Sequence, residues 1–174
     1  MFRGLVVCTA SKSLIVGARY PDTGLSIEVR THTALHVLKG AAAKVLGAKW
    51  TAGVYVEGIH GRLTVQLERK PTDEELAQVE QEANNKIRED ASIEELELDR
   101  AEAERRWGDA IYDLFPLPAS LTRLKILHIQ GWNVNTCKER HTKTTGEIGV
   151  LKIVKTRYRP AKQLLEISFE VSPS

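Results

Sequence analysis

The sequence predicts an α+β domain with a largely antiparallel sheet and packed helices. Two kinds of segment alternate along the chain. Some repeat apolar residues at helical spacing, as in 31–46, and others alternate apolar and polar residues, as in 62–68. Neighbouring strand-like segments are joined by short turns, which is typical of antiparallel hairpins. The chain has no internal repeat and no low-complexity linker.

Size and composition favour one domain in a reducing compartment. The 174 residues, 42% of them hydrophobic, can bury a sizeable core. Two cysteines that lie far apart argue against a disulfide scaffold. No apolar run approaches the roughly 20 residues that span a bilayer. The apolar stretch 5–10 is also shorter than a signal-peptide core of about 7–15 residues. We therefore expect a cytoplasmic protein without a membrane partner.

The first regular elements are predicted to be a strand and a helix. Residues 25–29 alternate apolar and polar side chains, which indicates a strand. Residues 31–46 repeat apolar side chains at helical spacing, and Gly47 is well placed to end this helix. The lysines expected on the solvent side are Lys39, Lys44 and Lys49.

A hairpin and a second helix follow. Residues 50–56 and 62–68 alternate cleanly on either side of a G-I-H-G turn, in which His60 is expected to be solvated. Thr72 and Glu75 then match the T-x-x-E capping box, which predicts the start of a helix of about four turns.

The middle of the chain repeats this pattern. Residues 93–98 resemble a short strand, and Asp99 and Glu102 form a second capping-box pattern for a helix that ends near Gly108. The D-L-F-P-L-P run at 113–118 cannot continue a helix and indicates an extended connection.

Three strands are predicted to complete the fold. They cover residues 124–129, 148–156 and 164–171, and the last two flank a hairpin turn at 159–162. His128 lies within the first of these segments, where a hydrogen-bonded strand histidine is the expectation.

Charge is distributed unevenly along the chain. The segment 72–109 has 14 acidic and 5 basic residues, whereas the segment 121–162 has ten basic residues and two acidic ones. A basic surface suits a phosphate-rich partner, because each neutralised phosphate releases counterions. Charge alone favours a solvated face over such a partner.

Two pairs of residues form the main candidate site. His32 and His36 are four residues apart, so a helix would place both imidazoles on one face. Cys137 and His141 repeat this spacing about a hundred residues later. Each pair alone is usually structural, but together they offer three imidazoles and one thiol, a ligand set that suits zinc.

The surrounding residues exclude several zinc enzymes. A zincin protease needs a glutamate directly after the first histidine, and here that position is Thr33. The H-x-E and P-C-x-x-C pattern of zinc deaminases is absent, and so is any C-x-x-C of a zinc ribbon. Cys137 paired with His141 could be a nucleophile, but a metal ligand is the favoured interpretation.

Four motifs in a fixed order resemble a known family. They are R-T-H-T-A-L-H at 30–36, D-L-F-P at 113–116, W-N-V-N-T-C at 132–137 and H-T-K-T-T-G-E-I-G at 141–149. This order resembles the editing domain shared by alanyl- and threonyl-tRNA synthetases. It is most similar to the short, free-standing members of the AlaX family of alanyl-tRNA editing proteins. The resemblance runs from about residue 25 to 171, so we expect residues 25–174 to form the editing domain and residues 1–24 an N-terminal extension.

The resemblance implies an activity and a site. The family hydrolyses mischarged tRNA, removing serine or glycine from tRNA for alanine without a nucleotide cofactor. It implies one zinc ion at His32, His36, Cys137 and His141, and a cleft for the 3′ adenosine. The catalytic candidates are His32, His36 and Asn135, whose amide stands where threonyl-type domains tend to carry an acid and so suggests substrate hydrogen bonding. Whether zinc activates water or positions the substrate stays open.

A tRNA-binding surface is expected on the basic C-terminal part, with the acidic helices away from it. Its expected contacts are Lys143, Thr145, Gly146, Lys152, Lys155, Arg157 and Arg159. The alternatives are editing of mischarged tRNA for threonine, a zinc-stabilised RNA-binding module without hydrolysis, and a structural zinc domain with a solvated basic face.

Overall fold

The computed structural model describes residues 19, 20 and 22–174, and its fold is α+β, as predicted. The described helices are α1 (Ile27–Leu46), α2 (Asp73–Arg88) and α3 (Arg100–Trp107), with short 3-10 turns η1 (Gly108–Ile111), η2 (Thr145–Ile148) and η3 (Pro160–Lys162). The strands are β1 (Thr51–Glu57), β2 (His60–Gln66), β3 (Glu94–Asp99), β4 (Arg123–Ile129), β5 (Asn133–Thr136), β6 (Val150–Arg159) and β7 (Leu164–Ser172).

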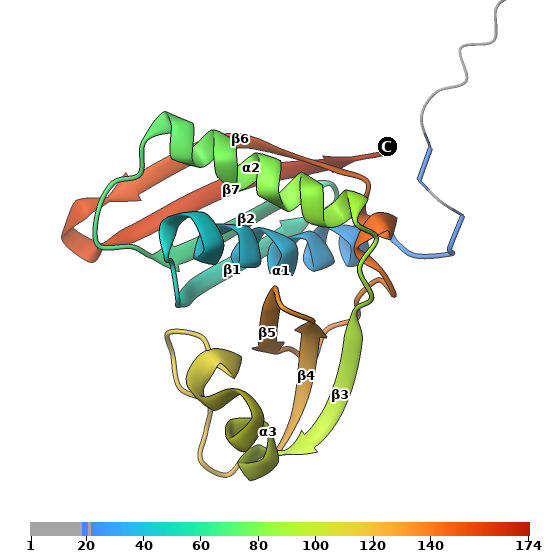
Figure 1. The fold of residues 1–174 in the computed structure, drawn as a ribbon, viewed down its shortest axis with the longest axis vertical. Coiled ribbons are helices and arrows are strands. Elements are labelled where there is room, and N and C mark those ends of the chain that lie inside the picture. Colours follow the sequence, from blue (N-terminus) through green and yellow to red (C-terminus); the bar gives the residue numbers. More distant parts are fainter. Residues whose placement is uncertain (1–18, 21) are drawn as a thin grey trace, which may run out of the picture.

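The strands form two antiparallel sheets. The larger has the order β1-β2-β7-β6, and the smaller has the order β3-β4-β5. Figure 1 shows α1 and α2 side by side over one face of the larger sheet, with the smaller sheet and α3 forming a separate part below α1. Among the described residues, no helix is both long and apolar enough to cross a bilayer.

Helix α1 begins earlier than predicted. The strand expected at 25–29 is wrong, because Ser26 is the N-cap, its side chain accepts a hydrogen bond from the Val29 amide, and residues from Ile27 onward are helical. The alternating residues after Ser26 therefore form the first turn of the helix that Ser26 caps. The helix ends as predicted at Gly47, whose φ of 70° is the left-handed conformation that glycine adopts readily.

The predicted hairpin and second helix are confirmed. Strands β1 and β2 pair antiparallel, and His60 is exposed at the start of β2, where it faces Glu170. The capping box of α2 is present in both directions: the Thr72 hydroxyl accepts from the Glu75 amide, and the Glu75 carboxylate accepts from the Thr72 amide.

The predicted boundaries of α3 are confirmed, but its capping box is not. Asp99 is the N-cap residue, yet within the described chain its side chain makes no capping hydrogen bond and pairs instead with Arg123 at 3.0 Å. A strand partner therefore competes with the local cap. Strand β5 was not predicted, since four residues are too few to show a clear alternation. The expected start of β6 at residue 148 is also wrong, because residues 145–148 form η2.

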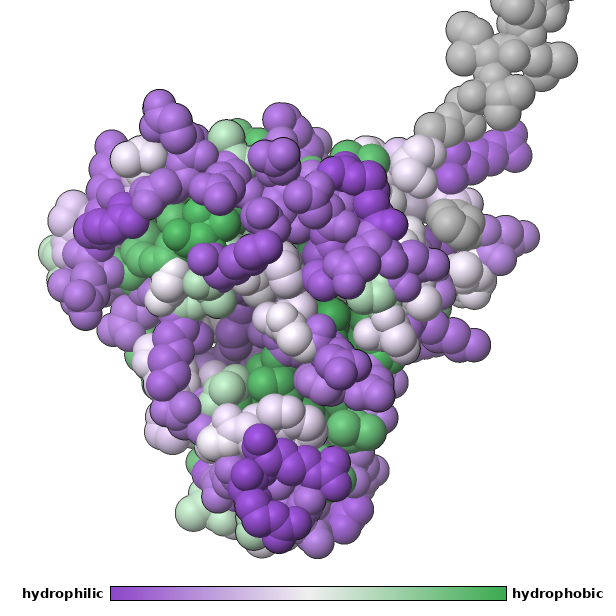
Figure 2. All heavy atoms as spheres, viewed as in Figure 1, coloured by the Kyte–Doolittle hydropathy of each residue, from purple (hydrophilic) through white to green (hydrophobic). Residues whose placement is uncertain are grey.

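Two hydrophobic cores share strand β4. Leu127 and Ile129 belong to the main core between the two long helices and the larger sheet. Leu124 and Ile126 belong to a smaller core that packs under α3. Figure 2 shows that hydrophilic side chains cover most of this face of the molecule. Exposed apolar side chains gather between α1 and α2 and over the smaller sheet.

The predicted N-terminal extension, residues 1–24, lies largely outside the described residues, which exclude 1–18 and 21. Its described end contacts α1. The Arg30 guanidinium lies over the Tyr20 ring, 4.8 Å from its centroid, and donates to the Thr23 hydroxyl.

Candidate metal centre

Four side chains from distant parts of the chain meet in one cluster. The ligand atoms of His32, His36, Cys137 and His141 all lie within 4.8 Å of one another. The centroids of the three imidazole rings are 5.0 to 5.3 Å apart, and His32 Nε2 lies 3.2 Å from Cys137 Sγ. The structure thus brings together the four residues that the sequence singled out as metal ligands.

The two halves of the cluster are held by backbone contacts. His32 and His36 lie on successive turns of α1, which is why both rings face the same side. Cys137 follows β5, and its amide donates to the Lys125 carbonyl at 2.9 Å. The amide of Thr142 donates to the Thr33 hydroxyl at 3.0 Å and so fastens the second pair to α1. Thr33, at the position of the zincin glutamate, therefore has a structural role: its hydroxyl joins α1 to the segment that carries His141.

The cluster favours neutral imidazoles. Burial lowers the pKa of His32 to about 4, and it also lowers the pKa values of His36 and His141. Neutral imidazole nitrogens are the form that binds a metal. Burial raises the pKa of the Cys137 thiol, an effect that a bound cation would reverse.

Two buried nitrogens in the cluster lack hydrogen-bond partners. Among the described residues, Nε2 of His36 and Nε2 of His141 have no hydrogen-bond partner. Unsatisfied buried polar atoms are costly and rare, so they mark the position of a missing partner. Three nitrogens and one sulfur at these separations are compatible with a single zinc ion, which would give the two unpartnered nitrogens a partner.

Asn135 lies beside the cluster, but its amide is already occupied. It is buried, its Oδ1 accepts from Lys39 Nζ at 2.7 Å, and its Nδ2 donates to the Ile111 carbonyl at 3.2 Å. Lys39 Nζ also donates to Asp113 at 2.9 Å. The prediction that Lys39 lies on the solvent side is therefore wrong: it is 7% exposed, whereas Lys44 and Lys49 are exposed as predicted.

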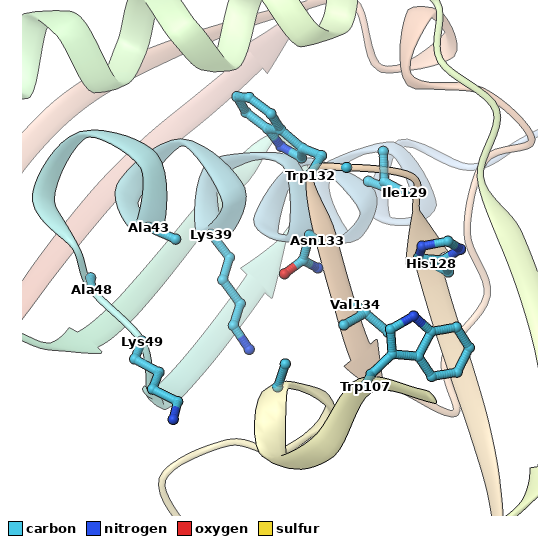
Figure 3. Close-up of a pocket in the computed structure, with 12 residues that line it drawn as sticks. Lys39, Ala43, Ala48, Lys49, Trp107, His128, Ile129, Trp132, Asn133 and Val134 are labelled. Carbon is cyan, nitrogen blue, oxygen red and sulfur yellow. The ribbon is translucent and has the colours of Figure 1, made fainter. Parts of the chain in front are cut away.

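A cavity of about 430 Å³ lies between α1 and the smaller sheet, and one of its lining residues, Asn133, contacts the cluster, with its Nδ2 3.4 Å from Nδ1 of His36. Figure 3 shows Lys39 and Lys49 on one side of it and Trp107, His128 and Val134 on the other. His128 is a hydrogen-bonded strand histidine, as expected, since its Nδ1 lies 2.8 Å from a Glu94 oxygen.

The tryptophans of this cavity were not singled out by the sequence. Trp132 lies against α1 at Gly40, and its Nε1 donates to the Val37 carbonyl at 3.0 Å. A Cβ at Gly40 would overlap the indole ring. A glycine in the middle of a helix, where it costs stability, was the available signal for a close approach.

The predicted tRNA contacts in the T-G-E-I-G motif have internal roles. Thr145 is fully buried, its hydroxyl donates to the Lys86 carbonyl at 2.7 Å, and it accepts from the Ala91 amide at 2.9 Å. The Gly146 amide donates to Asp90, whose carboxylate leaves no room for a Cβ at that glycine. The motif therefore joins η2 to the end of α2.

The predicted contacts that carry charge are Lys143, exposed before η2, and Lys152, Lys155, Arg157 and Arg159 on β6. The pairing of β6 with β7 shifts by one residue between Ile153 and Lys155. Because of this shift, the four basic residues of β6 all pair with every second residue of β7, from Leu164 to Glu170. The intervening residues of β7, such as Phe169, are buried in the main core. The four basic residues are therefore paired with β7 residues outside the core, and two form ion pairs, Lys152 with Glu80 of α2 and Arg159 with Glu166 of β7.

Proteins similar to this chain are alanine–tRNA ligases. That of Methanopyrus kandleri is 40% identical over 126 residues, which cover 72% of this chain and 14% of the ligase. Those of Saccharolobus islandicus (strain L.S.2.15) and Methanococcus aeolicus are 37% and 36% identical over 127 and 129 residues, again 14% of each ligase.

The chain contains a domain related to alanine–tRNA ligases. It spans only 14% of the length of these relatives, and no family model matches it. The ligase-related domain confirms the alanyl-tRNA synthetase side of the resemblance drawn from the motifs. The relatives' names describe ligation of alanine to tRNA.

Proposed function

We propose that the ligase-related domain is an aminoacyl-tRNA deacylase of the AlaX type. It would hydrolyse the ester of mischarged tRNA for alanine, with serine as the main substrate amino acid and glycine as a second. The observation that carries this proposal is the buried cluster of His32, His36, Cys137 and His141 in a chain related to alanine–tRNA ligases. In this proposal residues 25–174 form the hydrolytic domain.

We expect the cluster to hold one zinc ion. His32, His36 and His141 would bind it as neutral imidazoles and Cys137 as a thiolate. A bound zinc ion supplies Lewis acidity, either toward a water molecule or toward the substrate itself. An aminoacyl ester is already activated, so orientation of the ester and the attacking water by the protein would account for much of the remaining rate increase.

The cavity between α1 and the smaller sheet supports a nucleotide partner. Trp107 lines it, and stacking of a base on an aromatic face contributes about 1–3 kcal/mol. Lys39 Nζ has three N–H donors and uses two of them, on Asp113 and Asn135. Asn133 lines the cavity, and its Nδ2 lies 3.4 Å from His36 Nδ1. A terminal nucleotide bound here would lie against Asn133, which contacts His36 of the cluster.

A deacylation panel tests the proposal. The full chain is incubated with seryl-, glycyl- and alanyl-tRNA for alanine and with seryl-tRNA for threonine. We expect hydrolysis of the seryl and then the glycyl ester of tRNA for alanine, with the alanyl ester spared. Preference for the threonine tRNA would support the alternative of editing that tRNA. Failure to hydrolyse any of the four by zinc-loaded protein would refute the enzyme.

The cysteine ligand provides a matched pair of variants. Cys137→Ala should lower the zinc content measured by metal analysis and abolish deacylation, because it removes the thiolate. Cys8→Ala removes the other cysteine of the chain, which lies outside the described residues, and should change neither quantity. Unchanged zinc stoichiometry in Cys137→Ala would show that the thiol is not an important ligand.

A second candidate is a zinc-stabilised RNA-binding module without hydrolysis. Four protein donors fill a tetrahedral shell, which is typical of structural zinc sites. This alternative predicts that zinc-loaded protein binds tRNA, loses its fold when zinc is chelated, and leaves all four esters intact. The same panel therefore decides between the two functions.

A further inference from the structure

Glu95 contacts the metal cluster from a strand that contributes no ligand. It lies on β3, paired with Leu127 of β4, and its Oε1 is 2.7 Å from Nδ1 of His141. The two side chains differ in environment, since that of His141 is 1% exposed and that of Glu95 is 57% exposed. The carboxylate therefore reaches from solvent to the outer edge of a buried imidazole.

This contact determines which nitrogen of His141 is free. An ionised carboxylate only accepts hydrogen bonds, so the Nδ1 atom that faces it carries the proton. The lone pair then lies on Nε2, the same atom that has no hydrogen-bond partner among the described residues. Carboxylate, imidazole and cation in this order form a recurring arrangement around zinc.

A polar contact to another ligand histidine is weaker. Asn133 Nδ2 lies 3.4 Å from Nδ1 of His36, and an amide carries no charge. Charge also favours Glu95. Three neutral imidazoles and one thiolate would leave a net charge of +1 on a buried zinc site, and the carboxylate cancels it. Burying a neutral group costs far less than burying a charged one.

We propose that Glu95 is a positioning residue of the metal centre, which holds His141 as the Nδ1–H tautomer and presents Nε2 to a divalent zinc-like cation. This inference rests on the metal role proposed above for the four clustered residues. It extends the site to β3 and assigns a function to an acidic strand that would otherwise belong to the solvated face.

Glu97 provides a matched control. It lies two residues further along β3, so its side chain is on the same face of the strand as that of Glu95. Both residues line a shallow cavity of about 330 Å³ that reaches Cys137. Glu97 pairs with Arg123 at 3.3 Å rather than with a ligand histidine. Neutralising it changes the local charge equally without touching His141.

The test measures zinc affinity of the full chain by competition with a chromophoric chelator. Glu95→Gln keeps an acceptor but loses the charge, and Glu95→Leu loses both. We expect zinc affinity to fall about 10- to 100-fold in Glu95→Gln and further in Glu95→Leu, the range seen when such outer partners are removed. Glu97→Gln should change affinity less than threefold. Circular dichroism of each variant checks that the fold is retained.

Nitrogen-15 NMR of the metal-free chain provides a readout that does not depend on activity. We expect the Nδ1–H tautomer at His141 in the wild type and a mixture of tautomers in Glu95→Leu. Equal losses of zinc affinity in the Glu95 and Glu97 variants would show an effect of charge alone and overturn the proposal. Unchanged zinc affinity in both Glu95 variants would overturn it as well.

Failure of this inference is distinguishable from failure of the proposed function. Wild-type protein that binds zinc but hydrolyses no ester refutes the deacylase, while the comparison of Glu95 with Glu97 still decides the role of Glu95. Active wild-type protein whose zinc affinity ignores Glu95 refutes only the positioning role. Wild-type protein that binds no zinc refutes both.

Discussion

Replacing Lys39 tests the polar connection between the two parts of the fold. Its ammonium joins α1 to Asn135 on β5 and to Asp113 after η1, so it links the main core to the smaller one. Lys39→Met retains most of the apolar stem and removes the charge. We expect lower stability and, because Asn135 precedes Cys137 by two residues, weaker zinc binding.

The structure sets the size of this effect. Without the ammonium, the Oδ1 of Asn135 loses its donor at a position that is only 3% exposed, which costs about 1–3 kcal/mol. The Asp113 side chain is 40% exposed and can regain water, so loss of the ion pair adds only about 0–1 kcal/mol. We therefore expect a free energy of unfolding about 2 kcal/mol lower. In a chain of this size, that is a fall in Tm of about 4–8 °C.

Two further variants make this prediction specific, and all are measured by urea unfolding and thermal melting. Lys49→Met should cost at most about 0.5 kcal/mol, because that side chain is 54% exposed and its partner Asp109 is 63% exposed. Lys39→Met combined with Asn135→Leu should recover part of the loss, since no buried acceptor is then left unpaired. Equal losses for Lys39→Met and Lys49→Met would refute the reasoning.

The remaining predictions concern packing, pH and salt. Gly40→Ala should destabilise the fold by about 1–3 kcal/mol in urea unfolding, because the added methyl group overlaps the Trp132 indole ring. Hydrogen bonds from Arg69 and the Thr72 amide lower the pKa of Glu75 from 4.5 to about 2. Its stabilising contribution should be complete above pH 4.5 and lost as the pH falls through about 2, measured as the pH dependence of unfolding in wild type and Glu75→Gln. Reversing the charges of Lys155 and Arg157 should weaken tRNA binding and lower the salt slope of the binding constant by about two.

Each of these predictions has a control. Gly53→Ala should have little effect, since no described atom lies within 4 Å of the added methyl group. Glu74→Gln, next to the capping box, should leave the pH profile of unfolding unchanged, and a wild-type profile that matches Glu75→Gln at every pH would remove the capping argument. Lys70→Glu reverses the charge of a basic residue outside β6 and is the control for tRNA binding. A salt slope that is unaltered in the β6 variant would exclude this strand from the tRNA contact.

Elements whose signals are local were predicted well. The capping box of α2 depends on Thr72 and Glu75, which are three residues apart, and the end of α1 depends on the conformation of Gly47 alone. The β1–β2 hairpin follows from alternation and a short turn. In each case, the stabilising contacts lie within a few residues, so the sequence pattern and the structure report the same interaction.

Errors arose where a distant residue competes with the local pattern. Asp99 pairs with Arg123 of the neighbouring strand instead of capping its own helix. Lys39 lies at a position that helical spacing alone assigns to solvent, but Asp113 and Asn135 provide enough polar contacts to bury it. These outcomes depend on which strands pack together, and that information is not contained in a window of the sequence.

The sequence by itself determined the donor types of the candidate metal centre. Four-residue spacing of His32 and His36 on a helix, repeated by Cys137 and His141, specifies three nitrogens and one sulfur. Only the tertiary structure decided that the two pairs meet, that Glu95 contacts the imidazole of His141, and that Asn133 joins the cluster to a cavity. The reason is physical: ligand chemistry belongs to single side chains, whereas distance, burial and a second contact exist only after packing.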